Sequence, residues 1–244
     1  MANHILLNNV DHKDLKINTV RSKALGDNVM SCIAYPGEFR DLQVHYPIVF
    51  ARNPDRDETC AMALMGLVRG ENLFLSENGW DATYVPMAME MQPFLIGFSD
   101  GQDSPKQAVI HIDMDSPRVG EIGEPVFLPM GGTTPYLEHI TGVLNRVHAG
   151  YEQNSDFFEA LEKYGLLEPF SIDIELADGS SNRLAGFDTI NEDKLYALGG
   201  EALAELNVKQ YLLPIFMAVA SLSHFADLVE RKNAKVVSGA SGHA

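Results

Sequence analysis

Short apolar runs separated by turn-rich segments recur along the chain, and three of them follow an X-Pro step, at Pro47, Pro93 and Pro169. Each run is followed by a turn and a second apolar run, which is the pattern of a β-hairpin. The paired runs are 48–51 with 60–64, 94–98 with 108–112, and 170–176 with 183–187. Because a residue before proline is disfavoured in the α region, a preceding helix should end at each step. The pattern predicts three helix–X-Pro–hairpin units whose hairpins pair within one sheet or at each other's edges.

Helical periodicity fills the space before and between these hairpins. Short helices are predicted over 36–45 and 84–91. Thr134-Pro135 offers a helix cap and a first helical position, and Asn154 or Ser155 is the expected cap of a separate helix. The first of these long helices carries Leu137, Ile140, Leu144, Val147 and Tyr151 on one face, and the second carries Phe157, Phe158, Leu161 and Tyr164.

The C-terminal part is predicted to be helical. Short helices cover 191–198 and 201–206, with a Gly-Gly step between them. The last helix starts at Val208 or Leu213, depending on whether Pro214 kinks it or begins it, and runs to Lys232. Its apolar residues are spaced three and four apart, so they are expected to pack on the main core. These residues are Leu212, Ile215, Phe216, Val219, Leu222 and Phe225.

The predicted fold class is α+β, with antiparallel β-hairpins, packed helices and a C-terminal helical segment. Residues 1–35 mix polar and apolar positions and should form an N-terminal arm with one or two short strands. The main domain covers 36–190, and the helices of 191–232 pack on it. Residues 233–244 end in a small, polar sequence and are expected to be disordered.

Charge and composition narrow the function classes. The 244 residues are 45% hydrophobic and carry a formal net charge of −16. An acidic chain is a poor ligand for nucleic acid or for an anionic membrane surface. The N-terminus has no basic region before a long apolar run, and the run 211–222 is too short to span a bilayer. We therefore expect a soluble cytoplasmic protein without membrane insertion, with signal-independent export to the cell surface as the alternative.

The candidate binding site is the stretch around the single tryptophan. Its loops, 70–72 and 76–79, are polar and turn-forming, so they should lie at the surface. Trp80 and Tyr84 are four residues apart, and a helical turn would bring them to one face. Arg118 could supply a positive group for a carboxylate or phosphate. The predicted site is Glu71, Asn72, Trp80, Tyr84 and Arg118, for a protein partner or a small ligand such as a sugar or peptide group.

A second constellation is the weak metal candidate His111 and Asp113. Two residues apart on a strand, they would share a face, as in half of a non-haem iron site. The third ligand would have to be His45, His139 or His148. The simpler interpretation is a strand with a polar face, so no metal and no cofactor are expected. Cys32 and Cys60 lack zinc-site spacing and are expected to be buried thiols, and no nucleophile elbow or nucleotide-binding motif is present.

Several motifs resemble the bacterial SapC family over residues 36–232. They are 46–50 (Tyr-Pro-Ile-Val-Phe), 70–74 (Gly-Glu-Asn-Leu-Phe), Trp80 with 84–86, 116–118 (Ser-Pro-Arg) and 166–169 (Leu-Leu-Glu-Pro). The family is named for a protein linked to a bacterial surface layer. Similar proteins are often encoded beside TonB-dependent receptors and flavin-dependent halogenase-like proteins, so the resemblance implies a context of nutrient uptake or envelope biology. It supplies no catalytic residues.

Three functions remain open from the sequence. The first is a non-catalytic binding or accessory protein that works with uptake or halogenase-like enzymes. The second is a metal-dependent enzyme that uses His111 and Asp113, and the third is a surface-layer component. The first is preferred, and homo-oligomer formation is left open.

Overall fold

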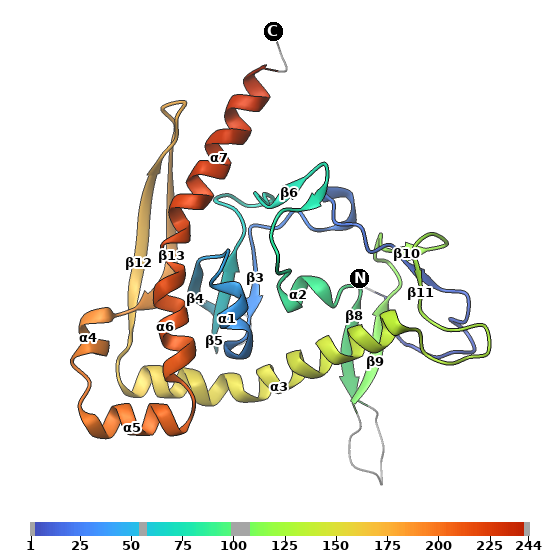
Figure 1. The fold of residues 1–244 in the computed structure, drawn as a ribbon, viewed down its shortest axis with the longest axis horizontal. Coiled ribbons are helices and arrows are strands. Elements are labelled where there is room, and N and C mark those ends of the chain that lie inside the picture. Colours follow the sequence, from blue (N-terminus) through green and yellow to red (C-terminus); the bar gives the residue numbers. More distant parts are fainter. Residues whose placement is uncertain (1–2, 54–57, 99–107, 242–244) are drawn as a thin grey trace.

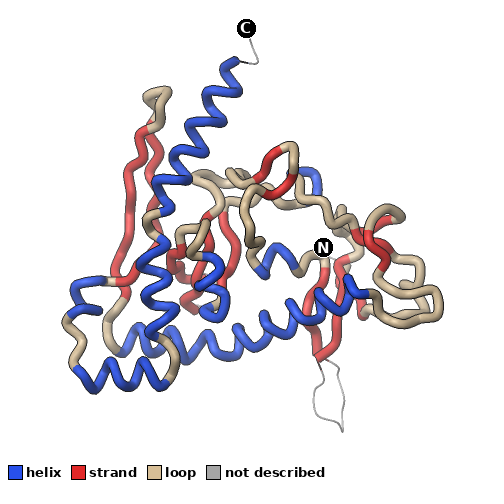
Figure 2. The backbone as a smooth tube through the Cα atoms, viewed as in Figure 1, coloured by secondary structure: helices blue, strands red, loops and turns tan. Residues whose placement is uncertain are grey.

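The computed structural model describes residues 3–53, 58–98 and 108–241, and its helices and antiparallel sheets confirm the α+β class. Strands gather in two main groups, and one long helix runs past both (Figures 1 and 2). The strands are β1 His4–Leu6, β2 Lys16–Ile17, β3 Ser31–Ala34, β4 Ile48–Asn53, β5 Glu58–Leu64, β6 Leu75–Ser76, β7 Gly79–Trp80, β8 Phe94–Phe98, β9 Ala108–Asp113, β10 Val119–Gly120, β11 Glu124–Pro125, β12 Leu167–Glu175 and β13 Ser181–Ile190. The helices are α1 Phe39–Leu42, α2 Met87–Glu90, α3 Pro135–Lys163, α4 Glu192–Tyr196, α5 Gly200–Val208, α6 Leu212–Ser221 and α7 His224–Ser241, with short 3-10 turns η1 Lys23–Leu25 and η2 Pro36–Glu38.

The three predicted hairpins all form, but they do not share one sheet. The first and third lie in a five-stranded sheet of order β12-β13-β4-β5-β3, where Asp188 of β13 pairs with Phe50 of β4. The β8–β9 hairpin instead forms a three-stranded sheet with β1, so the prediction is wrong for the unit at Pro93. The reason is long-range: the free edge of β9 is taken by the N-terminal strand β1, whose residues His4, Ile5 and Leu6 pair with Asp113, Ile112 and His111. Pro169 lies inside β12 rather than before it, and an edge strand tolerates its missing N–H.

The N-terminal segment is not a separate arm. Its three strands enter three different sheets, and β3 completes the five-stranded one next to β5. The expectation of one or two short strands was therefore too small, because isolated strands of two to four residues have little periodicity to detect.

Helix α3 is one continuous helix of 29 residues. The predicted cap at Thr134 is confirmed, since its hydroxyl accepts a hydrogen bond from Leu137 N at 3.2 Å. The predicted second start at Asn154 or Ser155 is wrong, because the buried stripe continues through that region to Phe157. Tyr151 is 50% exposed, and Gly150 takes the inward position, where a Cβ atom would come 2.8 Å from Cβ of Tyr35.

The main core lies between the five-stranded sheet and the helices α1, α3, α6 and α7, and a smaller core joins the β1-β9-β8 sheet to the first half of α3. At the C-terminus the single predicted helix is two helices, α6 and α7, with Pro214 in the first turn of α6. Ile215 and Phe225 are buried as expected, but Phe216 is 44% exposed, so its assignment to the core is wrong. The tail predicted to be disordered from residue 233 is helical as far as Ser241, and α7 runs beside the β12–β13 hairpin (Figure 1).

Candidate functional site

Trp80 is anchored from inside the fold. Its Nε1 donates to the hydroxyl of the fully buried Tyr46 at 2.8 Å, and that hydroxyl donates to the Tyr84 carbonyl at 2.5 Å. Trp80 lies in β7 and Tyr84 in the irregular segment before α2, so the expected helical turn between them is absent. The helix begins later because Pro86 is the residue at its N-cap. Both aromatic side chains are half-buried against the main core.

The Tyr84 hydroxyl binds a buried carboxylate. It donates to Oε2 of Glu38 at 2.9 Å, and Met87 N donates to the same oxygen at 3.0 Å. Tyr35 N donates to Oε1 at 3.1 Å. Burial raises the pKa of Glu38 above its ordinary value of 4.5, and these three hydrogen bonds oppose the rise only in part. The network fixes the entry to α2 against η2.

The raised pKa of Glu38 predicts that the stability of the protein depends on pH. Between pH 4.5 and the raised folded-state pKa, the unfolded chain has released the Glu38 proton while the folded protein keeps it. The unfolding free energy should therefore fall as pH rises through this window. Chemical denaturation of the wild type and Glu38→Gln across the window measures the two slopes. We expect the Gln variant to lack the Glu38 part of the slope, and equal slopes would contradict the assignment.

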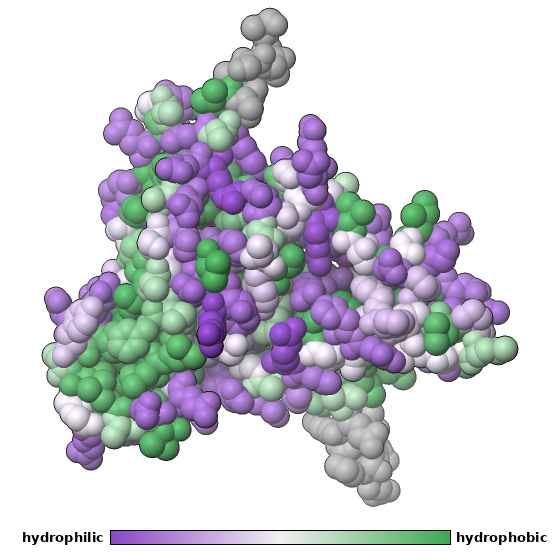
Figure 3. Space-filling model, viewed as in Figure 1, coloured by the Kyte–Doolittle hydropathy of each residue, from purple (hydrophilic) through white to green (hydrophobic). Residues whose placement is uncertain are grey.

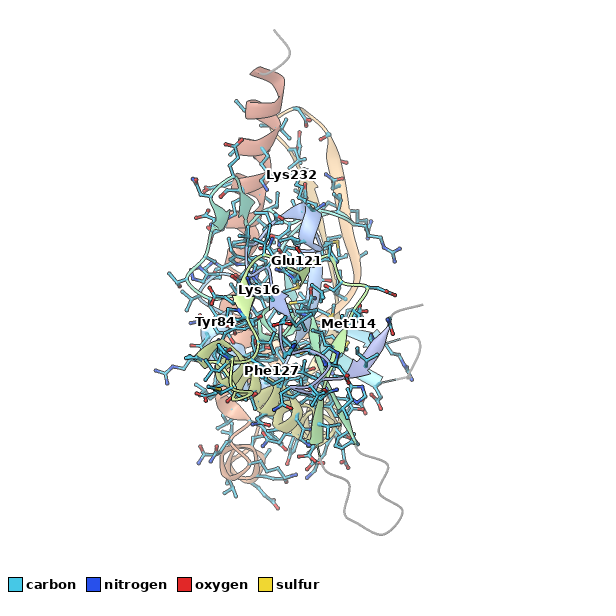
Figure 4. All side chains as sticks on the ribbon, turned by 90° about the vertical axis from the view of Figure 1, so that its right-hand side faces the viewer. Lys16, Tyr84, Met114, Glu121, Phe127 and Lys232 are labelled. Carbon is cyan, nitrogen blue, oxygen red and sulfur yellow. The ribbon has the colours of Figure 1, made fainter. Side chains whose placement is uncertain are left out.

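Glu71 and Asn72 are held under α7. Glu71 forms an ion pair of 2.5 Å with Lys232, and Lys235 donates to the Asn72 carbonyl at 2.9 Å. Asn72 is only 1% exposed, and its side chain bridges the Asp27 carbonyl and the amide of Phe74. Lys232, which marks the Glu71 end of the predicted site, lies well apart from Tyr84 (Figure 4).

Arg118 is part of a buried ion pair rather than a surface group. Its exposure is 2%, and Nη2 lies 2.5 Å from Oδ1 of the fully buried Asp27. Asn72 and Arg118 are thus joined through Asp27, by one hydrogen bond and one ion pair. The hydrogen bonds of the Arg118 guanidinium group go to Asp27 and to the carbonyls of Asn18 and Val20, and none of these partners belongs to the Trp80 loop.

The metal candidates have other partners. Oδ1 of Asp113 accepts hydrogen bonds from Asn3 N at 3.2 Å and Asp115 N at 3.1 Å, so it caps the turn after β9. The His111 ring lies over Gly97 of β8, where a Cβ atom would come 2.7 Å from Nε2. Within the described ranges, no three His, Cys, Asp or Glu side chains come together as a metal site. The three histidines considered as third ligands contact Thr83 (His45), Glu90 (His139) and Glu152 (His148).

The two cysteines are weak nucleophiles in this fold. Cys32 is buried and Cys60 is half-buried, and both are free thiols. Burial raises the pKa of each thiol above its usual range, so the thiol form dominates at neutral pH.

An apolar surface feature lies on the C-terminal helices. We call it the C-terminal apolar face, and Figure 3 shows apolar surface gathered over α5 and the start of α6. Its members are large hydrophobic side chains with exposures from 37% to 81%, namely Tyr196, Leu203, Val208, Leu213 and Phe216. The sequence pattern does not reveal this face, because the spacing of Phe216 fits a buried stripe equally well.

A groove of about 490 Å³ opens beside the C-terminal apolar face, between the α5–α6 connection, η2 and α3. Phe157, Leu212 and Met217 contribute apolar surface to it, and its charged lining residues are Arg40 and Lys209. Among the described residues, no carboxylate lines the groove, although the chain carries a net charge of −16. The groove therefore presents positive charge and apolar surface together.

The apolar run 211–222 alone is too short to span a bilayer, but the longer segment 212–237 is not. By length and hydropathy alone, Leu212–Val237 is apolar enough to cross a membrane. In the fold, 33% of its most apolar window is buried, and Ile215, Phe225 and Leu228 of this segment fill the main core. Part of this apolar character therefore serves the core, and Leu213 and Phe216 of the segment belong to the C-terminal apolar face.

Comparison with known proteins gives one match. A family model described as SapC matches residues 7–228, which include every element from β2 to α6. Neither the curated proteins nor the solved structures give a significant match to this chain.

Proposed function

The chain belongs to the SapC family, and from this membership we propose that it is a non-catalytic accessory protein that binds a partner protein through its C-terminal apolar face. The observation that supports the proposal is the gathering of exposed Leu203, Val208, Leu213 and Phe216 on α5 and α6. Large contiguous apolar patches on soluble proteins mark interaction surfaces, whereas scattered exposed apolar residues do not.

The adjoining groove suggests the chemistry of the partner segment. Arg40 is exposed and makes no ion pair with any side chain in the described part of the chain, and Lys209 lies 3.6 Å from Glu205. An acidic side chain next to bulky apolar residues would complement both the groove and the face. A bilayer is a weaker candidate for the same surface, because a chain of charge −16 is repelled by anionic lipid.

The family context supplies candidate partners. As stated above, similar proteins are often encoded beside TonB-dependent receptors and flavin-dependent halogenase-like enzymes. We place this protein in the cytoplasm as an accessory to such an uptake or modification system. The surface-layer and metal-enzyme alternatives predict a different cell fraction and a bound metal, respectively.

The proposal predicts the behaviour of a double variant. Leu213→Ser with Phe216→Ser should weaken partner capture about tenfold or more, since burial of each side chain is worth about 1.5–3 kcal/mol. Both side chains are about half exposed, so the melting temperature should change little. The measurement is quantitative affinity capture from the native cell, with wild type and variant as parallel baits and identification of the captured proteins.

The matched control is Ile122→Ser, which removes an apolar side chain that is 82% exposed and lies in the segment between β10 and β11. It should capture the same partners as the wild type. Equal capture by the double variant and the wild type would refute the C-terminal apolar face as the binding surface. If the double variant and Ile122→Ser were both enriched in the membrane fraction, the protein would bind a membrane component through a surface other than the C-terminal apolar face.

A further inference from the structure

A second cavity lies far from the C-terminal apolar face in the sequence and is lined by different residues. Its volume is about 290 Å³, and its walls come from the segment 18–21, the end of α2 and the first two turns of α3. Arg21, Arg118 and Tyr136 supply its hydrogen-bond donors, and Glu90 and Glu124 supply its carboxylates. All of its lining residues belong to the described part of the chain.

Arg118 lines this cavity and has one unused hydrogen-bond donor. Its Nη1 donates to the carbonyls of Asn18 and Val20, and its Nη2 donates to Asp27. The remaining nitrogen, Nε, is buried and has no hydrogen-bond partner among the described residues. Since buried polar atoms are nearly always paired, an unpaired guanidinium N–H on a residue that lines a cavity points to a hydrogen-bond partner among the molecules that the cavity can hold.

Two neighbouring groups offer further donors. Arg21 donates through Nη1 to the Met89 carbonyl at 2.9 Å and lies 3.3 Å from Asp27, while its Nε and Nη2 make no hydrogen bond within the described ranges. Tyr136 packs its ring on Phe94, and its hydroxyl likewise has no hydrogen-bond partner there. Burial raises the pKa of Tyr136 to about 12 against the opposing influence of both arginines, so this hydroxyl stays protonated and can donate.

The cavity also carries negative charge. Oε1 of Glu90 lies 2.8 Å from Nε2 of His139, and Glu124 is exposed on β11. A simple anion would meet the guanidinium groups but would also face these carboxylates. A ligand with both signs of charge would satisfy the donors on one side and the carboxylates on the other.

We propose that this cavity binds a small zwitterionic amino acid, with its carboxylate on Arg118, Arg21 and Tyr136 and its ammonium group on Glu90 and Glu124. Guanidinium groups bind carboxylates through directed hydrogen bonds, and a neutral phenol adds one more. The cavity volume of about 290 Å³ fits a ligand of this size and not a protein segment. This site is independent of the proposed partner-binding face.

The test is calorimetric titration of the full chain with a panel of free L-amino acids at low ionic strength. Each amino acid is compared with its amide, which lacks the carboxylate, and with the matching simple carboxylic acid, which lacks the ammonium group. We expect at least one amino acid to bind at one site per chain. The Kd of each of its two analogues should be higher by about tenfold or more. Binding should weaken as salt is added, because charged groups carry it.

Variants keep the test independent of folding, since replacing Arg118 would break the buried pair with Asp27. Tyr136→Phe should raise the Kd about tenfold or more while the melting temperature stays near that of the wild type. Arg21→Gln should raise the Kd by a similar factor but also lower the melting temperature, because Arg21 pairs with the buried Asp27. Tyr196→Phe removes the same hydroxyl from an exposed tyrosine of α4 and should leave the Kd unchanged. Three results would overturn the proposal: no binding by any amino acid, equal binding by either analogue, or unchanged binding in both cavity variants.

Discussion

A chain that ends after Val208 is expected not to fold cooperatively. It loses α6 and α7, which bury Ile215, Ala218, Phe225 and Leu228 to 6% exposure or less. Removing one large side chain from a core costs about 2–5 kcal/mol, so the combined loss of Ile215, Phe225 and Leu228 is about as large as the 5–15 kcal/mol that typically stabilises a domain. The truncated protein should be insoluble or lack a thermal transition.

Two contacts explain why the rest of the fold depends on these helices. The hydroxyl of Ser221, at the end of α6, accepts a hydrogen bond from Ile48 N at the start of β4, at 2.8 Å. Phe225 of α7 stacks on Phe170 of β12 with ring centroids 5.1 Å apart. The helices therefore join two of the predicted hairpins across the five-stranded sheet, and their removal exposes that face.

The matched control ends after Lys235, which keeps the hydrogen bonds from Lys235 to the carbonyls of Asn72 and Leu75. This shorter deletion should lower the melting temperature by about 2 °C or less, as expected for a change of under 1 kcal/mol. Circular dichroism and calorimetric melting measure both proteins. A soluble product of the longer truncation with a sharp transition would show that the C-terminal helices are not part of the core.

Asp27→Ala is expected to destabilise the protein by about 3–5 kcal/mol, because it leaves a buried guanidinium group without its counter-ion. The Asp27 carboxylate is fully buried and accepts hydrogen bonds from Ser22 N at 2.8 Å and from Arg118 at 2.5 Å. Nη1 of Arg21 lies 3.3 Å from Oδ1 of Asp27, which is the oxygen that accepts from Arg118. One carboxylate thus joins the segment 21–27 to the segment at 118, which are far apart in sequence.

Asp173→Ala provides the comparison for a pair in solvent. Asp173 lies 3.8 Å from Arg183, and their side chains are 78% and 67% exposed. Its loss should change the unfolding free energy by about 0.5 kcal/mol or less. Urea denaturation of both variants gives the two differences directly, and similar values for Asp27 and Asp173 would contradict the buried-pair assignment.

Several residues that were predicted to lie at a surface binding site are buried or half-buried in the structure. Glu71 and Asn72 have the composition of a surface turn, yet Asn72 is 1% exposed because α7 crosses over it and Asp27 lies beneath. Trp80 is half-buried, and its indole N–H is used inside the fold by Tyr46. As a consequence, Trp80→Ala would test packing at least as much as binding.

Local features were available from the sequence alone because they depend on neighbouring residues. Thr134 caps α3 through a side chain that accepts an amide hydrogen bond three residues ahead, as its residue type predicts. Each X-Pro step was also followed by a real hairpin, since proline and turn residues act within a few positions of the chain. These signals gave the α+β class and most strand positions.

The tertiary structure decided which elements and side chains are neighbours. The β8–β9 hairpin lies in a separate sheet because β9 pairs with β1. The sequence of β1 has no periodicity that would predict this partner. Phe216 and Ile215 are adjacent and equally apolar, but only Ile215 faces the sheet, because the rotation of α6 is fixed by packing and by the Ser221 contact. Arg118 and Asp27 are 91 residues apart in sequence, and only the closed fold buries them against each other and places Arg118, with one unpaired guanidinium N–H, in the wall of a cavity.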